Sequence, residues 1–159
     1  MQAYFKQLFE YDKWANHQLL DKFEKQFPQN PRIYELFSHL LSAQRIWLDR
    51  ILGIPESVVR FQDRLPDEMG QDLENYHTEW MEFIDQLQPS DFDRVISYIH
   101  PNGQPYNDRL IDIMAHVVNH GTHHRGNLVI LMKEEGFVAP TLDLIFYVRS
   151  KQATPNPPR

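Results

Sequence analysis

One stretch of the chain decides its interpretation: His116-Val117-Val118-Asn119-His120-Gly121-Thr122-His123-His124-Arg125-Gly126. It holds four of the eight histidines of the sequence. The stretch lies within a helical pattern, because apolar residues recur three and four positions apart on both sides of it. We expect this helix to run from about Asn107 to Glu135, with Asn107 and Asp108 capping its start and Gly136 its end.

A helix of 3.6 residues per turn places His120 and His124 one turn apart on the side of the apolar stripe. Two imidazoles so placed can bind one metal ion. His116 and His123 fall on the flanks, where they could orient ligands or substrate. Buried histidines that only satisfy hydrogen bonds remain an alternative, although each buried ring would then need its own polar partner.

Gly121 lies on the same face of this helix. A glycine in the middle of a helix costs about 1 kcal/mol relative to alanine. We therefore expect another group to need the space that a side chain would fill.

Composition limits the class of protein. The length of 159 residues predicts one domain, residues 1–150, followed by a flexible tail, residues 151–159. The net charge of -6 and the lack of a Lys/Arg cluster argue against a nucleic-acid partner. The absence of cysteine excludes disulfides, a cysteine nucleophile and thiolate ligands. Without a signal peptide or an apolar run of about 20 residues, we expect a cytoplasmic protein with no membrane association.

The rest of the chain predicts an all-α fold. Amphipathic patterns indicate helices over residues 2–27, 31–52 and 66–87, and Asn30, Pro31 and Gly53 mark both ends of the second. Residues 94–106 read as a small β-hairpin, and residues 141–149 as one or two helical turns. The prediction is a four-helix bundle with a hairpin between helices three and four and a short C-terminal helical segment. The loop 54–65 is either a solvated crossover or the mouth of a pocket.

A third ligand could come from the second helix. His39 lies on the edge of its apolar stripe and can face inward, which makes it the best third ligand on geometry. Alone, it would be read as a histidine bonded to a neighbouring carbonyl. His77 is a weaker candidate, and His17 and His100 need no function.

These features together resemble the DinB-like (DinB/YfiT) family, which includes proposed metalloenzymes. The resemblance covers nearly the whole chain and rests on four segments: Tyr11–Asn16, His39-Leu40, Asn119–Asn127 and Leu142–Tyr147. Asn127 stands where the family often has glutamine. The resemblance implies a bundle that holds one divalent ion, often nickel or zinc, on His39, His120 and His124.

Three neutral imidazoles leave an open position on such an ion, which is typical of a catalytic site. The ion could activate water, polarise a carbonyl or bind a thiol. Similar proteins include transferases and isomerases that use bacillithiol, mycothiol or related thiols. The leading hypothesis is a metal-dependent hydrolase or low-molecular-weight-thiol S-transferase in detoxification or stress response, acting on a small-molecule substrate.

The sequence does not select a general base for this chemistry, since Glu35, Asp12 and His116 are all candidates. A second hypothesis is a metal-binding protein without turnover, in which the ion stabilises the bundle and apolar C-terminal residues form a homodimer interface. A third is a metal-free bundle with structural histidines. The metal and the substrate stay open.

Overall fold

Helix α2 (Pro31–Leu52) begins and ends where its sequence predicts. The Asn30 side chain accepts a hydrogen bond from the backbone N–H of Arg32 at 3.0 Å, and Pro31 occupies the first turn. Gly53 ends the helix in the left-handed conformation, with φ of 68°, which glycine adopts without a steric cost. These signals fix the position of His39 along the bundle.

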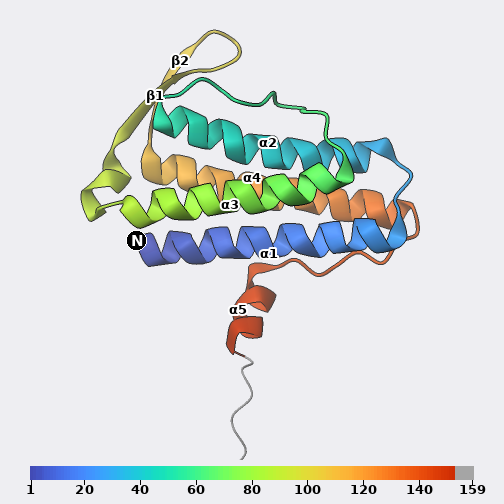
Figure 1. Ribbon diagram of the computed structural model, residues 1–159. Helices are drawn as coiled ribbons and strands as arrows, with labels where there is room; N and C mark the ends of the chain where they lie inside the picture. Colours follow the sequence, from blue (N-terminus) through green and yellow to red (C-terminus); the bar gives the residue numbers. More distant parts are fainter. Residues whose placement is uncertain (153–159) are drawn as a thin grey trace, which may run out of the picture.

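The computed structural model describes residues 1–152. Four long helices lie side by side: α1 (Gln2–Gln26), α2, α3 (Pro66–Gln86) and α4 (Leu110–Glu134). The chain runs in one direction in α1 and α4 and in the opposite direction in α2 and α3 (Figure 1). The crossover segment, residues 53–65, therefore returns along the length of the bundle between α2 and α3. The predicted helical bundle with a small hairpin is confirmed.

The hairpin follows a 3-10 turn, η1 (Pro89–Asp93), and pairs β1 (Val95–Ile99) with β2 (Pro105–Arg109). The predicted start of the last long helix at Asn107 is wrong. Asn107 pairs with Ser97 and accepts a hydrogen bond from its Oγ at 2.6 Å. Asp108 accepts one from the Tyr98 hydroxyl at 2.7 Å. Because both side chains serve the strand pairing, β2 runs to Arg109 and α4 begins only at Leu110.

The C-terminal segment returns across α1 and forms α5 (Leu144–Gln152). The Tyr11 hydroxyl donates a hydrogen bond to the Leu142 carbonyl at 2.8 Å, and the ring of Tyr147 packs 5.7 Å from that of Trp14. The predicted helical segment is confirmed. It extends two residues into the predicted tail, and the remainder of that tail, residues 153–159, lies outside the described residues. Within residues 1–152, no helix has the length and apolar character to cross a membrane.

Candidate metal centre

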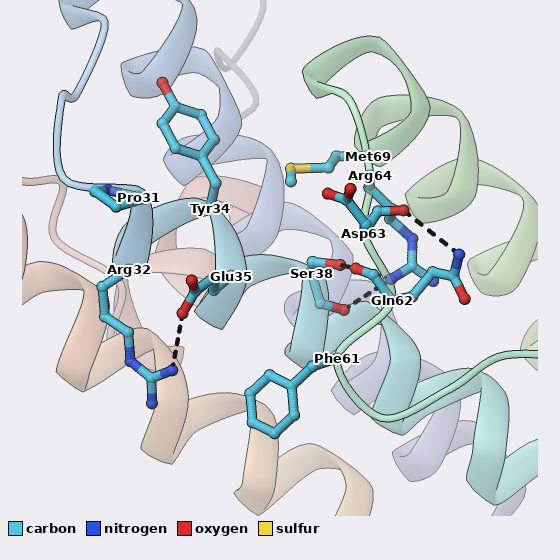
Figure 2. A pocket seen from close by; sticks show the side chains of 10 residues that line it. All are labelled: Pro31, Arg32, Tyr34, Glu35, Ser38, Phe61, Gln62, Asp63, Arg64 and Met69. Carbon is cyan, nitrogen blue, oxygen red and sulfur yellow. Dashed lines mark hydrogen bonds and ion pairs between the residues drawn. The ribbon is translucent and has the colours of Figure 1, made fainter.

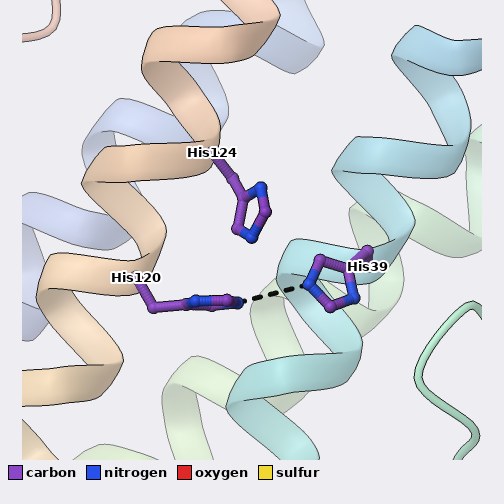
Figure 3. Close-up of side chains that lie close together, drawn as sticks. All are labelled: His39, His120 and His124. Carbon is purple, nitrogen blue, oxygen red and sulfur yellow. Dashed lines mark hydrogen bonds between the residues drawn. The ribbon is translucent and has the colours of Figure 1, made fainter.

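Three histidines from two helices converge on one point. His39 projects from α2, and His120 and His124 project from α4 (Figure 3). Each offers one ring nitrogen, and these three nitrogens lie within 4.8 Å of one another. The Nε2 atoms of His39 and His120 are 3.3 Å apart. The structure thus brings together the three residues that the sequence proposes as metal ligands.

The crossover segment holds His39 in place. The backbone carbonyl of Arg60 lies 3.0 Å from Nδ1 of His39. A carbonyl can only accept, so Nδ1 carries the proton and Nε2 presents its lone pair toward the other two histidines. The ring of Phe61 stacks on that of His39 at 4.6 Å. A hydrogen bond from His39 to a backbone carbonyl would also suit a structural histidine. Here it leaves Nε2 free, as in metal-binding histidines that are oriented through their other ring nitrogen.

All three imidazoles are neutral at physiological pH. Burial, together with the charges of the neighbouring histidines, lowers the pKa of His120 to about 3. Burial likewise lowers the pKa of His124 to about 4 and that of His39 below its usual value. Nδ1 of His124 is buried without a hydrogen-bond partner among residues 1–152, so no protein group fixes which nitrogen carries its proton. Neutral nitrogen donors of this kind fit a divalent transition-metal ion.

These pKa values predict how acid affects the metal-free protein. Unfolded histidines take up protons below about pH 6.5, whereas folded His120 and His124 resist protonation until about pH 3 to 4. The unfolded state therefore binds more protons in this window, and stability falls as the pH drops from about 6.5. We expect urea unfolding after EDTA treatment to show this loss. In a His120→Gln/His124→Gln variant the loss should be smaller, and parallel curves for the two proteins would contradict the prediction.

The flanking histidines differ in their surroundings. The ring of His116 lies 5.4 Å from that of His120 and 5.2 Å from that of Trp47. His123 is exposed, and its Nε2 lies 3.4 Å from the side-chain nitrogen of Asn127. Neither residue hydrogen-bonds to the three central histidines within the described part of the chain. Their predicted role in orienting ligands or substrate stays a prediction.

Two further histidines lie elsewhere. His77 is buried, with Nε2 3.3 Å from a carboxylate oxygen of Glu10, and His17 lies 2.6 Å from Glu74. Both positions are on the contact between α1 and α3. This placement, apart from the three central histidines, agrees with His77 being the weaker ligand candidate.

A cavity of about 790 Å³ opens beside the three histidines. His39, His120 and His116 border it, together with side chains of α2, the crossover segment and the hairpin. A second cavity, about 620 Å³ and including Arg32, Glu35 and Phe61, contains none of the three (Figure 2). The crossover segment contributes to both cavities, which answers the question that its sequence left open.

Comparisons with known proteins agree with this architecture. The model of the DinB family matches residues 1–157. The chain belongs to the DinB family. Protein DinB of Bacillus subtilis (strain 168) is 20% identical over 158 residues, covering 89% of this chain and 91% of that protein. The crystal structure of a DinB-like protein from Bacillus cereus ATCC 10987 has the same fold, with a TM-score of 0.62 at 18% identity, covering 87% of this chain and 95% of that one.

Two of the segments that carry the DinB resemblance meet in a buried polar network that the sequence did not predict. Asp12 of α1 forms an ion pair with Arg125 of α4, and the two residues are 2% and 1% exposed. Asn16 contacts both, through Arg125 Nη1 at 3.0 Å and Asp12 Oδ2 at 3.2 Å. Gln44 of α2 also donates to Asp12. The network ties α1 and α2 to α4 at the residue that follows His124.

This network changes the assignment of the candidate bases in the DinB-family site. Both carboxylate oxygens of Asp12 are engaged by Arg125, Asn16 and Gln44, which favours a structural role for Asp12 over that of a base. Glu35 accepts a hydrogen bond from Arg32 at 3.1 Å and lines the second cavity. Of the three candidates, His116 alone borders the cavity beside the histidines.

Proposed function

We propose that this DinB-family protein binds one divalent transition-metal ion on His39, His120 and His124 and acts as a metal-dependent enzyme on a small molecule. The observation that carries the proposal is a group of three neutral imidazoles from two helices, of which His39 and His120 border a cavity of about 790 Å³. The bound ion, nickel or zinc by the resemblance to the DinB-like family, would supply Lewis-acid chemistry toward water, a carbonyl or a thiol.

The chain's own residues hold the three histidines in position and form the cavity beside them. The Arg60 carbonyl and the Phe61 ring hold His39 in one orientation. The Asp12–Arg125 pair fixes α4 beside His124. The cavity admits a small substrate to the open side of the three histidines. The two reaction classes that we propose are hydrolysis and S-transfer from a low-molecular-weight thiol, in detoxification or stress response. Because the chain has no cysteine, the thiol in the second class must come from a cosubstrate.

An alternative is that the ion only stabilises the bundle. One observation favours it, since the three histidines bridge α2 and α4 and an ion there would cross-link the two helices. Ile145 and Phe146 of α5 are 49% and 44% exposed, which supports the homodimer interface proposed with this alternative. The cavity at the histidines favours the enzyme, because a purely structural site is closed by protein ligands.

Metal analysis of protein purified without a histidine tag tests the site. We expect about one equivalent of divalent metal per wild-type chain and a substoichiometric amount in His124→Ala. His123→Ala is the matched control, since His123 is the exposed neighbour outside the group and its loss should leave the metal in place. Equal metal content in wild type and His124→Ala would refute the proposal. A screen of ester and amide substrates with thiol cosubstrates then separates the two reaction classes.

A further inference from the structure

The cavity beside the histidines holds one arginine without a counter-charge. Arg60 lines this cavity from the crossover segment. Its carbonyl accepts the hydrogen bond from His39, and its guanidinium forms no ion pair with any residue of 1–152. The same residue therefore supports a metal-ligand candidate with its backbone, and its exposed side chain carries an unpaired positive charge at a residue that lines the cavity.

The other charges that line the cavity cancel. Arg50 lies 2.8 Å from a carboxylate oxygen of Glu56, and its Nε donates to the same oxygen at 2.9 Å. The Arg50 guanidinium also lies over the rings of Trp47, at 4.8 Å, and Tyr98, at 5.1 Å. The charges of Arg50 and Glu56 thus neutralise each other within the cavity wall. The positive charge of Arg60 remains, although the chain as a whole carries a net charge of -6.

The remaining wall is apolar and aromatic. Trp47 packs edge to face on Tyr98 at 5.2 Å, and its ring also lies 5.2 Å from that of His116. Ile46 of α2 and Val58 of the crossover segment also line the cavity. Rings and aliphatic groups of this kind bind a flat apolar body by excluding water from it.

We propose that this cavity binds a small carboxylate with a flat apolar body, the carboxylate on the Arg60 guanidinium and the body against the Trp47 wall. A guanidinium presents paired N–H donors that match one carboxylate, and such charge-assisted bonds are stronger than neutral ones. That this ligand is the substrate of the metal site rests on the proposed function. The binding preference itself depends only on Arg60 and the wall.

Calorimetric titration with two matched probes tests the preference. The probes are 2-naphthoate and its neutral amide, 2-naphthamide, and the protein is used as purified, with its metal content measured on the same sample. We expect the wild type to bind the carboxylate about tenfold more tightly than the amide. Arg60→Gln should remove this difference while leaving metal content unchanged, because the backbone carbonyl that holds His39 is retained.

Arg149→Gln is the control for net charge, since Arg149 belongs to α5 on the α1 side of the bundle, away from the cavity. It should keep the wild-type preference. Equal affinity of the wild type for the two probes, or an unchanged preference in Arg60→Gln, would overturn the inference even if the metal is present. A chain without metal that still prefers the carboxylate through Arg60 would support the binding site and refute the metal proposal instead.

Discussion

Replacing Arg125 with methionine is expected to lower the free energy of unfolding by about 3–5 kcal/mol at neutral pH. The substitution keeps an apolar stem of similar length but leaves the Asp12 carboxylate buried, 2% exposed, without its counter-charge. Such a charge must be desolvated without the attraction that offsets the penalty. Urea unfolding followed by circular dichroism measures the change.

Two comparisons identify the buried pair as the cause. Arg109→Met removes an exposed arginine immediately before the same helix, where its partner Asp112 is also exposed, so we expect little change. The double variant Asp12→Leu/Arg125→Met removes both charges. Its loss in free energy of unfolding should be smaller than the sum of the losses in the two single variants by about 2 kcal/mol or more. An Arg125→Met protein as stable as Arg109→Met would contradict this account.

The Asp12–Arg125 pair also shows where sequence reasoning reached its limit. Helical periodicity placed Arg125 next to a ligand candidate and Asp12 on the first helix, but the two are separated by 113 residues. Which polar side chains meet across a bundle depends on the rotation and register of each helix, and no local pattern states these. The sequence therefore leaves Asp12 among three candidate bases, whereas its buried pairing with Arg125 favours a structural role.

Local sequence signals are more informative for features that depend on a single helical turn, such as helix ends and the spacing of two ligands. Asn30, Pro31 and Gly53 predicted both ends of α2, and the spacing of His120 and His124 predicted that they share a face. The approach of His39 to the other two histidines depends on how α2 packs on α4. The only local signal for it is the position of His39 at the edge of the apolar stripe of α2. The start of α4 was missed because its capping residues also suit a strand. Pairing of these residues with β1 selects the strand over the helix, and this pairing is a tertiary contact that the local pattern does not contain.

Gly121→Ala is the second substitution with a large expected effect. A Cβ at Gly121 would lie 2.5 Å from Oδ1 of Asp12 and 2.9 Å from Nη1 of Arg125. The predicted need for space at this glycine is confirmed, and the group that uses it is the buried ion pair. Neither partner can move away cheaply, because Asn16 and Gln44 hold Asp12 from other sides. We expect a loss of about 1–3 kcal/mol, as for overpacked cores.

Gly126→Ala in the same helix is the matched control. A Cβ there meets no atom within 4 Å, so the variant should gain about 0.5–1 kcal/mol from helix propensity alone. The two alanine variants are therefore expected to move the urea midpoint in opposite directions. If Gly121→Ala also displaces the pair, the rotation of α4 changes and metal content should fall together with stability. Stabilisation by both alanines would show that the Asp12–Arg125 contact adapts and does not set the position of His124.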